Sequence, residues 1–339
     1  MKLNFGFLFC SLFFLQTYAQ PLPKNSDYCY RKITTGFGPE DLQIDTITNP
    51  NRPRLLIACA TRRENEPQIA EIYAHNIDSG FAYPLVRIEP QNTHFNPHGL
   101  DLVNVRDSLI LLVVSHNDSA KEHSIIRYFV KGDSLFFLQK ITNNLFTSPN
   151  AVTGSSNGDF WVSNDAGKRG NAFEYVFRQK KSKVIYCKGN DCEIAADKIC
   201  FGNGILVSEN TIYEASTMPG AIYQYTLENG KMTHQKMIIE LSGVDNIRLH
   251  NGELIVAAHL RFMQFLSHMK NAEKKSPTAI YAVNPTSGEK RLLFFNDGSI
   301  INAASTGLVF RNKLYIAQVF DPFILEVDLS CHNAEKKSN

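Results

Sequence analysis

The sequence predicts an all-β fold, a six-bladed β-propeller, and three observations lead to this prediction. First, a polar turn followed by a short apolar or β-branched run recurs six times at intervals of roughly 50 residues, a period typical of propeller blades. Second, each unit continues into further strand-like segments, such as SIIRYFV at 124–130 and FILEVDL at 323–329. Third, helical periodicity is almost absent outside 260–269. The six runs are anchored at Leu55, Leu111, Phe160, Ile212, Leu254 and Leu314.

The composition is that of a globular protein with a sizeable core. Hydrophobic residues make up 43% of the 339 residues and charged residues 20%, which excludes a disordered or collagen-like chain. Lys and Arg total 35 against 33 Asp and Glu, so no basic excess favours a nucleic-acid partner. We expect a single domain over residues 20–339, with its core at about 29–331. The N- and C-terminal strands should close one blade, with the segment after Cys29, YRKITTG, paired in the blade that ends with FILEVDL.

The first 19 residues read as a cleaved signal peptide. Lys2 is followed by an apolar run at 5–15, and Thr17-Tyr18-Ala19 fits a small-residue cleavage site. The run is too short to cross a bilayer, and no later segment has 18 consecutive apolar residues, so we expect no membrane span. The prediction is a secreted or periplasmic protein that is cleaved near Ala19.

Six cysteines remain after this cleavage, and an even number in an oxidising compartment permits disulfides of undetermined connectivity. Cys29 and Cys331 lie near the two ends of the mature chain, so a bridge between them would close almost all of it. Cys187, Cys192 and Cys200 are close together in the sequence, so two of them could form a local disulfide. The pairing of Cys59 stays open. A zinc site is disfavoured, because the cysteines form no CxxC pair and no histidine lies nearby.

A small polar cluster precedes each of the six anchors, at the expected start of an innermost strand. Because the innermost strands of a propeller line one central channel, equivalent positions at their starts should converge on its axis. The residues at these positions are Glu40, His98, Asn150, Asn203, Asp245 and Asn246. Carboxylate and amide oxygens without thiolates favour a hard cation, calcium more than magnesium. Taken singly, each cluster reads more simply as a solvated loop.

The ordered motifs resemble the paraoxonase/arylesterase family, within the gluconolactonase-like propeller superfamily. The resemblance covers about Cys29 to Cys331 and rests on a set of segments in a fixed order. These are GPEDL at 38–42, FNPHGLDLVNVRDSLILLVVSHND at 95–118, SPNAVTGSSNGDFWVSND at 148–165, FGNGI at 201–205, VDNI at 244–247 and STGLVFRNKLYIAQVF at 305–320.

The resemblance implies a propeller with two central calcium ions and a disulfide between the chain ends, here Cys29–Cys331. The catalytic calcium ligands implied by the motifs are Glu40, Asn164, Asn203, Asp245 and Asn246. The structural calcium ligands implied are Asp41, Asp165 and the backbone carbonyl of Leu100. The implied catalytic histidines are His98 and His116, and His259 matches a further pocket histidine.

These parts suit hydrolysis of a lactone or an aryl ester. Calcium can act as a Lewis acid on the carbonyl, His98 can take a proton from water, and His116 can orient or relay. A serine nucleophile has little support, because the chain lacks a G-x-S-x-G motif. A purely structural role for His116 is an equal alternative.

Several features differ from the animal members of the family. The segment 166–183 is basic and polar, so a lipoprotein or membrane partner is not implied. Residues 260–275 form an insertion that is either a lid or a surface helix, and Asn117 begins a glycosylation sequon.

The leading hypothesis is an exported calcium-dependent hydrolase with a small-molecule lactone or ester substrate. The alternatives are a sugar-lactonase or strictosidine-synthase-like propeller, and a non-catalytic, calcium-stabilised binding propeller.

Overall fold

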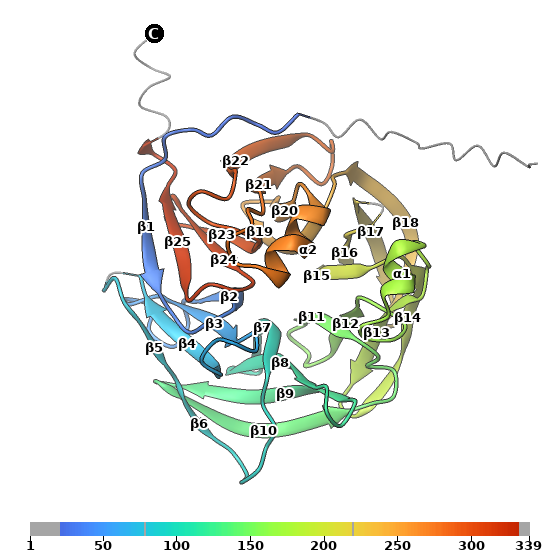
Figure 1. Ribbon diagram of the computed structural model, residues 1–339. Coiled ribbons are helices and arrows are strands. Elements are labelled where there is room, and N and C mark those ends of the chain that lie inside the picture. Colours follow the sequence, from blue (N-terminus) through green and yellow to red (C-terminus); the bar gives the residue numbers. More distant parts are fainter. Residues whose placement is uncertain (1–20, 78, 219, 332–339) are drawn as a thin grey trace, which may run out of the picture.

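The computed structural model describes residues 21–77, 79–218 and 220–331, which fold into six β-sheets around a central channel (Figure 1). The predicted signal peptide, residues 1–19, lies outside the described residues. The six-bladed propeller predicted from the repeat is confirmed.

Each sheet is one blade, with its first strand nearest the axis. Blade 1 holds β2 (Pro39–Asp45), β3 (Arg54–Ala60), β4 (Ala70–Asn76) and β5 (Ala82–Pro84). Blade 2 holds β7 (Pro97–Val105), β8 (Ser108–Asn117), β9 (Glu122–Lys131) and β10 (Ser134–Thr142), with β6 (Val86–Ile88) added at its outer edge. Blade 3 holds β11 (Pro149–Gly154), β12 (Phe160–Asn164), β13 (Ser182–Lys188) and β14 (Asp191–Ile199).

The remaining three blades follow the same order. Blade 4 holds β15 (Gly202–Ser208), β16 (Thr211–Ser216), β17 (Ala221–Glu228) and β18 (Lys231–Glu240). Blade 5 holds β19 (Val244–His250), β20 (Glu253–His259), β21 (Thr278–Val283) and β22 (Lys290–Asn296). Blade 6 holds β23 (Ala304–Phe310), β24 (Lys313–Gln318), β25 (Phe323–Asp328) and β1 (Tyr30–Thr34). Two short helices, α1 (Ala172–Val176) and α2 (Phe262–Lys270), lie in the connections within blades 3 and 5.

The core is divided into clusters that lie between adjacent blades. One cluster joins Val114 of blade 2 to Val152 and Phe160 of blade 3, and another joins Ala215 of blade 4 to Val256 of blade 5. All six anchors of the sequence repeat lie in the second strands and are completely buried. Burial of one such side chain stabilises a fold by about 1.5–3 kcal/mol, so the repeat marks the residues that hold neighbouring blades together.

The two ends of the chain close the ring in one blade. Strand β1 pairs antiparallel with β25, with Tyr30 opposite Val327 and Thr34 opposite Phe323. Cys29 and Cys331 form a disulfide directly beside this pairing. A second disulfide, Cys187–Cys192, crosses the β13–β14 hairpin, and Cys59 and Cys200 are free and buried. The structure thus confirms the end-to-end disulfide and assigns the local pair that the sequence left open.

The inner strands share a local irregularity that builds the channel. In all six, the register with the second strand shifts at the start of the inner strand, as a β-bulge does. The residues that fall out of the ladder are Glu40, His98, Gly99, Asn150, Ala151, Asn203, Gly204, Asp245, Asn246 and Ser305. These positions include every polar residue that the repeat predicts to converge on the axis.

Two of these positions require glycine, because neighbouring inner strands approach closely there. A Cβ on Gly99 would lie 2.4 Å from the carbonyl oxygen of Asn150, and one on Gly204 would lie 2.5 Å from that of Asp245. A side chain at either position would push adjacent blades apart at the channel.

Among the described residues, the structure has no helix long and apolar enough to cross a membrane.

The two disulfides should differ in their contribution to stability. The Cys29–Cys331 bridge closes a loop of 302 residues, whereas Cys187–Cys192 spans five. The chain-entropy model then gives about 6 and about 2 kcal/mol, respectively. We expect Cys29→Ser/Cys331→Ser to lower the urea midpoint much more than Cys187→Ser/Cys192→Ser. Equal midpoints for the two double variants would contradict the closing role of the end-to-end bridge.

Candidate functional site

The polar residues at the six bulges form a ring at the mouth of the channel, which we call the channel ring. Asn246 donates its amide N–H to Thr306 Oγ1 at 3.0 Å, and Asn203 donates to Thr217 Oγ1 at 3.3 Å. These bonds use the amide nitrogens and fix both side chains. The amide oxygens, Asn203 Oδ1 and Asn246 Oδ1, are buried without a hydrogen-bond partner among the described residues. Buried oxygens without a donor are rare in folded proteins and indicate a position for a water or an ion.

Three carboxylates gather beside these oxygens. Burial raises the pKa of Asp245, and the negative charge of Glu40 adds to the shift. Burial likewise raises the pKa of Asp165 to about 6, again with a contribution from Glu40, although the neighbouring Ser148 and Asn150 side chains oppose the rise. Like charges that raise one another's pKa are stabilised when a cation is placed between them. The donor set of the channel ring therefore fits a hard oxygen-ligated cation such as calcium.

The two asparagines of blade 3 have different environments. Asn164 ends the second strand β12, where its Oδ1 accepts from the Ser148 N–H at 3.0 Å and its Nδ2 donates to the carbonyls of Leu145 and Lys183. Its side chain is thus held by the backbone of its own blade. Asn150 occupies the bulge of the inner strand β11 and lies close enough to Asp165 to lower the pKa of that carboxyl. The structure therefore brings Asn150 to the channel ring, as the repeat indicates, and does not bring Asn164 there.

The residues implied for a second ion lie in two separate places. Asp41 and Leu100 meet deep in the channel, where Asp41 Oδ2 accepts from the Leu100 N–H at 2.9 Å. The guanidinium of Arg248 contacts both Asp41 and the Leu100 carbonyl. Asp165, the third residue implied, is at the channel mouth with Asn150 instead.

An arginine that the sequence did not single out lies at the edge of the channel ring. Both Nε and Nη2 of Arg62 donate to Glu40 Oε2, at 2.9 and 2.5 Å, and Nη2 also contacts His98 Nδ1 at 2.9 Å. All of these Glu40 contacts are at Oε2, so Oε1 makes no hydrogen bond with the described residues. Arg62 thus fixes the side chains of Glu40 and His98 relative to one another.

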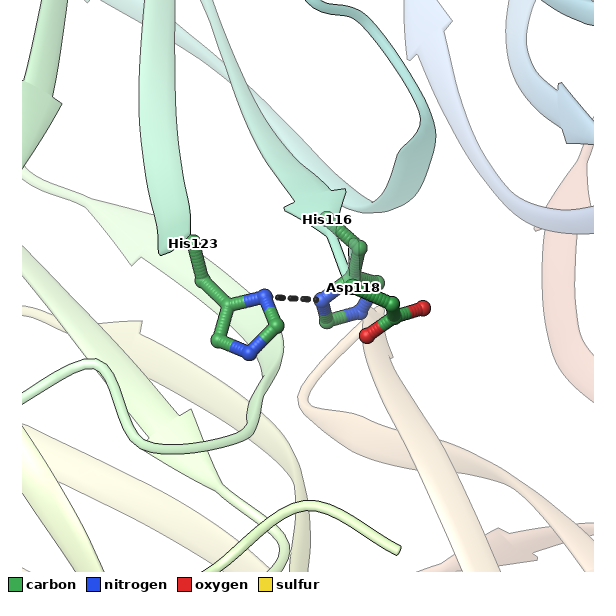
Figure 2. A group of neighbouring side chains, drawn as sticks. All are labelled: His116, Asp118 and His123. Atoms are coloured by element: carbon green, nitrogen blue, oxygen red, sulfur yellow. Dashed lines mark hydrogen bonds between the residues drawn. The ribbon is translucent and has the colours of Figure 1, made fainter. Parts of the chain in front are cut away.

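A row of three histidines runs from the channel ring toward the surface. The rings of His98 and His116 are 5.0 Å apart and those of His116 and His123 are 4.9 Å apart, each pair edge to face. The Nδ1 atoms of His116 and His123 are 3.1 Å apart, the contact drawn in Figure 2. His123 also lines a surface groove of about 540 Å³. The row connects the channel ring to solvent.

Burial keeps the two inner histidines neutral. It holds the pKa of His98 well below the ordinary value, with help from the charges of Arg62 and Arg169. Burial also holds the pKa of His116 well below that value, and the charge of Arg169 adds to the effect. Asp118 lies beside His116 and His123 (Figure 2), but its carboxylate pairs with Arg169 at 2.8 Å. This positive neighbour disfavours a separate metal ion there.

The remaining predicted residue, His259, supports the channel ring from behind. Its Nε2 is 2.8 Å from Asp245 Oδ2, and its ring packs against Phe265 of α2 with centroids 4.3 Å apart. Phe265 belongs to a chain of ring contacts over the channel mouth, which we call the aromatic wall. Its members are Tyr175, Phe201, Phe262, Phe265 and Phe320.

The aromatic wall shows where the insertion at 260–275 lies. Helix α2 carries two of its rings, and the helix is held by Arg63, which donates to the His268 carbonyl at 3.0 Å and stacks over Phe320. The insertion is therefore docked beside the channel mouth, with Phe265 turned toward His259.

A family model described as arylesterase matches residues 85–326. The chain belongs to the arylesterase family. A relative, serum paraoxonase/arylesterase 1 of Rattus norvegicus, is 26% identical over 67% of this chain and 66% of its own length. The Mus musculus protein of the same name is 24% identical over 80% of this chain and 76% of its own. Serum paraoxonase/lactonase 3 of Homo sapiens is 24% identical over 67% of both chains. The chain thus spans about two thirds to three quarters of the curated relatives it matches.

Solved structures agree with the fold of this arylesterase-family chain. A gluconolactonase from Xanthomonas campestris superposes with a TM-score of 0.54 at 14% identity, over 89% of this chain and 88% of the other. A luciferin-regenerating enzyme superposes with a TM-score of 0.55 at 11% identity, over 89% and 95%. At such low identity these similarities establish the propeller alone.

Sequence reasoning missed three residues of the site: Arg62, His123 and Arg248. Arg248 is visible as a charge directly after the VDNI motif, within the inner strand VDNIRLH. Asn150 was flagged by the repeat but not by the ND dipeptide. Arg62 and His123 had no signal, because their roles follow from which strands meet at the axis.

Proposed function

We propose that the protein is an exported calcium-dependent hydrolase of lactones and aryl esters. The observation that carries the proposal is the pair of buried, unpartnered oxygens, Asn203 Oδ1 and Asn246 Oδ1, facing crowded carboxylates beside a histidine row. Membership of the arylesterase family supports an ester or lactone hydrolase. The two disulfides are consistent with export to an oxidising compartment.

The proposed calcium ligands are Glu40, Asn150, Asn203, Asp245 and Asn246, with Asn150 in place of the Asn164 implied by the sequence motif. Bound there, calcium would polarise the carbonyl of the substrate as a Lewis acid. The chain itself prepares this position: His259 fixes Asp245, Thr306 fixes Asn246, and Arg62 fixes Glu40.

His98 is the proposed base that takes a proton from the attacking water. A guanidinium only donates hydrogen bonds, so the contact with Arg62 places the lone pair of His98 on Nδ1. That atom is 3.2 Å from Glu40 Oε2 and therefore faces the channel ring. A water that replaces Arg62 at Nδ1 would lie next to the ligands of the carbonyl-binding cation. Because burial keeps His98 neutral, Nδ1 keeps its lone pair at neutral pH and can accept from that water once Arg62 has moved away.

His116 and His123 are the proposed route by which the proton leaves. One Nδ1 of this pair carries a hydrogen and the other accepts it. If His116 is the donor, its unprotonated Nε2, which has no hydrogen-bond partner among the described residues, can accept from His98. His123 at the surface groove then exchanges with solvent.

The aromatic wall is the proposed contact for the apolar part of the substrate. Its rings lie next to His259 and hence next to Asp245. A lactone with an alkyl substituent, or the ring of an aryl ester, would bury apolar surface there while its carbonyl points to the channel ring.

Assays with and without a chelator test the function. Calcium-loaded protein should hydrolyse simple γ- and δ-lactones and phenyl esters, EGTA should abolish the activity, and calcium should restore it. Activity that persists after elemental analysis shows calcium to be gone would contradict the metal role. Absence of turnover on any lactone, sugar lactone or aryl ester would favour a non-catalytic binding propeller.

Two asparagine variants test the ligand assignment. Asn150→Ala should weaken calcium binding by roughly 10–100-fold, since even supporting partners of metal ligands have effects of this size. Asn164→Ala should leave the calcium Kd unchanged but lower the free energy of unfolding by about 1–3 kcal/mol, because three buried backbone groups lose their hydrogen-bond partner. Isothermal titration and urea unfolding measure the two effects. The reverse pattern would restore Asn164 as the ligand.

A third pair of variants tests the base. His98→Gln should lower kcat for lactone hydrolysis by about 10²–10⁴-fold while the calcium Kd stays the same. His234→Gln, at an exposed histidine of β18, is the matched control and should not change kcat. A wild-type rate for His98→Gln from pH 6 to 9 would show that another group accepts the proton.

A further inference from the structure

The deep end of the channel holds a buried carboxylate that is already hydrogen-bonded on both of its oxygens. Asp41 is 1% exposed, and its Oδ2 accepts from the Leu100 N–H. Its Oδ1 accepts from the Leu42 N–H at 2.9 Å, from Thr306 Oγ1 at 3.0 Å and from the guanidinium of Arg248. These four bonds fill the acceptor capacity of Oδ1 and half of that of Oδ2. The guanidinium of Arg248 already occupies the position beside Asp41 and supplies the positive charge that a metal ion would bring.

Arg248 reaches this point from the inner strand of blade 5 across the channel. Its side chain is 7% exposed, and its Nη2 contacts Leu100 O at 3.3 Å as well as Asp41. Its Nε donates to Leu42 O at 3.0 Å and its Nη1 to Ile247 O at 2.9 Å. The guanidinium thus connects blades 1, 2 and 5 through backbone carbonyls, the kind of oxygen that a structural calcium ion would collect.

Arg248 also compensates a second buried carboxylate. Asp101 of β7 is 9% exposed and is held by the Gly154 N–H at 2.9 Å and by Gln43 Nε2 at 2.7 Å. Burial raises the pKa of Asp101, and the charge of Arg248 opposes that shift, as it does for Asp41. A fixed positive charge therefore lies between two carboxylates on different blades.

We propose that Arg248 replaces the second, structural cation of this propeller, so that the folded chain binds one calcium ion rather than two. The residues implied for that ion do not fit it: Asp41 and Leu100 O are taken by the guanidinium, and Asp165 lies at the channel mouth. A guanidinium is permanently charged and cannot dissociate, so the deep part of the channel stays compensated when calcium is removed. This proposal rests on the proposed function in one respect only: its single calcium ion is the one assigned there to the channel ring.

Elemental analysis of the full chain, desalted from calcium buffer, gives the first test. We expect one calcium per chain in the wild type, and two would overturn the proposal. If no calcium is found, the proposed calcium role at the channel ring is wrong. The absence of an ion from the deep position would still agree with Arg248 as the permanent positive charge there. The two proposals therefore fail separately.

Variants at Arg248 give the second test, with melting temperature as the readout in EGTA and in millimolar calcium. Arg248→Ser should melt about 10 °C lower than wild type in EGTA, because it leaves a buried carboxylate uncompensated. Calcium should restore part of that loss, since a cation can then reach Asp41 and Leu100 O. Arg248→Lys keeps the charge and should lose less than half as much, which keeps the test valid if the serine variant fails to fold.

Arg54→Ser is the matched control. Arg54 is another buried arginine, paired with Asp45 at 3.0 Å in blade 1 and with Asp133 in blade 2. Its loss should also lower the melting temperature, but calcium should raise the melting temperature of this variant only as much as it raises that of wild type, because Arg54 lies outside the channel ring and the deep site. A wild-type melting temperature for Arg248→Ser in EGTA would overturn the proposal. So would equal calcium rescue of the serine variants at 54 and 248.

Discussion

Convergence of negative and unpaired oxygens on the channel axis is the constraint on which the rest of this structure depends. Six inner strands each break register at their first residues and bring polar groups to one place. Burying like charges together is strongly unfavourable unless a positive charge accompanies them. Two arginines supply part of that positive charge: Arg248 pairs with Asp41, and Arg62 pairs with Glu40 at the edge of the channel ring.

At the top of the channel this compensation is incomplete: Arg62 pairs with Glu40, but the amide oxygens of the channel ring have no donor among the described residues. Asn203 and Asn246 have their nitrogens bonded and their oxygens unpartnered, while Asp245 is fixed by His259. The side chains are thus held in position before any ion arrives, which reduces the ordering needed on binding. The same fixed geometry explains why the histidine row matters. A neutral base at the edge of a preorganised, partly buried site can act on a water without a large rearrangement.

The closing elements stabilise this arrangement from outside. Strand β1 completes the last blade and the Cys29–Cys331 bridge ties the two chain ends beside it. The blades are joined by apolar clusters between sheets, so opening one blade would disturb the positions of its neighbours at the axis. The aromatic wall and α2 add an apolar surface over the mouth, where the polar channel ring meets solvent. Stability and site geometry therefore depend on the same contacts.

The sequence by itself determined the number of blades, the strand that closes the ring, and most of the channel ring. These features repeat along the chain: Leu254 and its five equivalents mark second strands, and Glu40 or Asn203 marks the start of an inner strand. Local patterns of this kind are visible because the alternation of side chains in a strand fixes which face is buried.

Only the tertiary structure decided which side chains meet at the channel axis and which of their polar atoms are already hydrogen-bonded. The ND dipeptide pointed to Asn164, but the bulge in β11 puts Asn150 at the channel ring and leaves Asn164 bonded to its own blade. Arg62 reaches Glu40 from 22 residues away and Arg248 reaches Asp41 from 207. Such contacts leave no local pattern, because they depend on how neighbouring and distant blades are brought together when the ring closes.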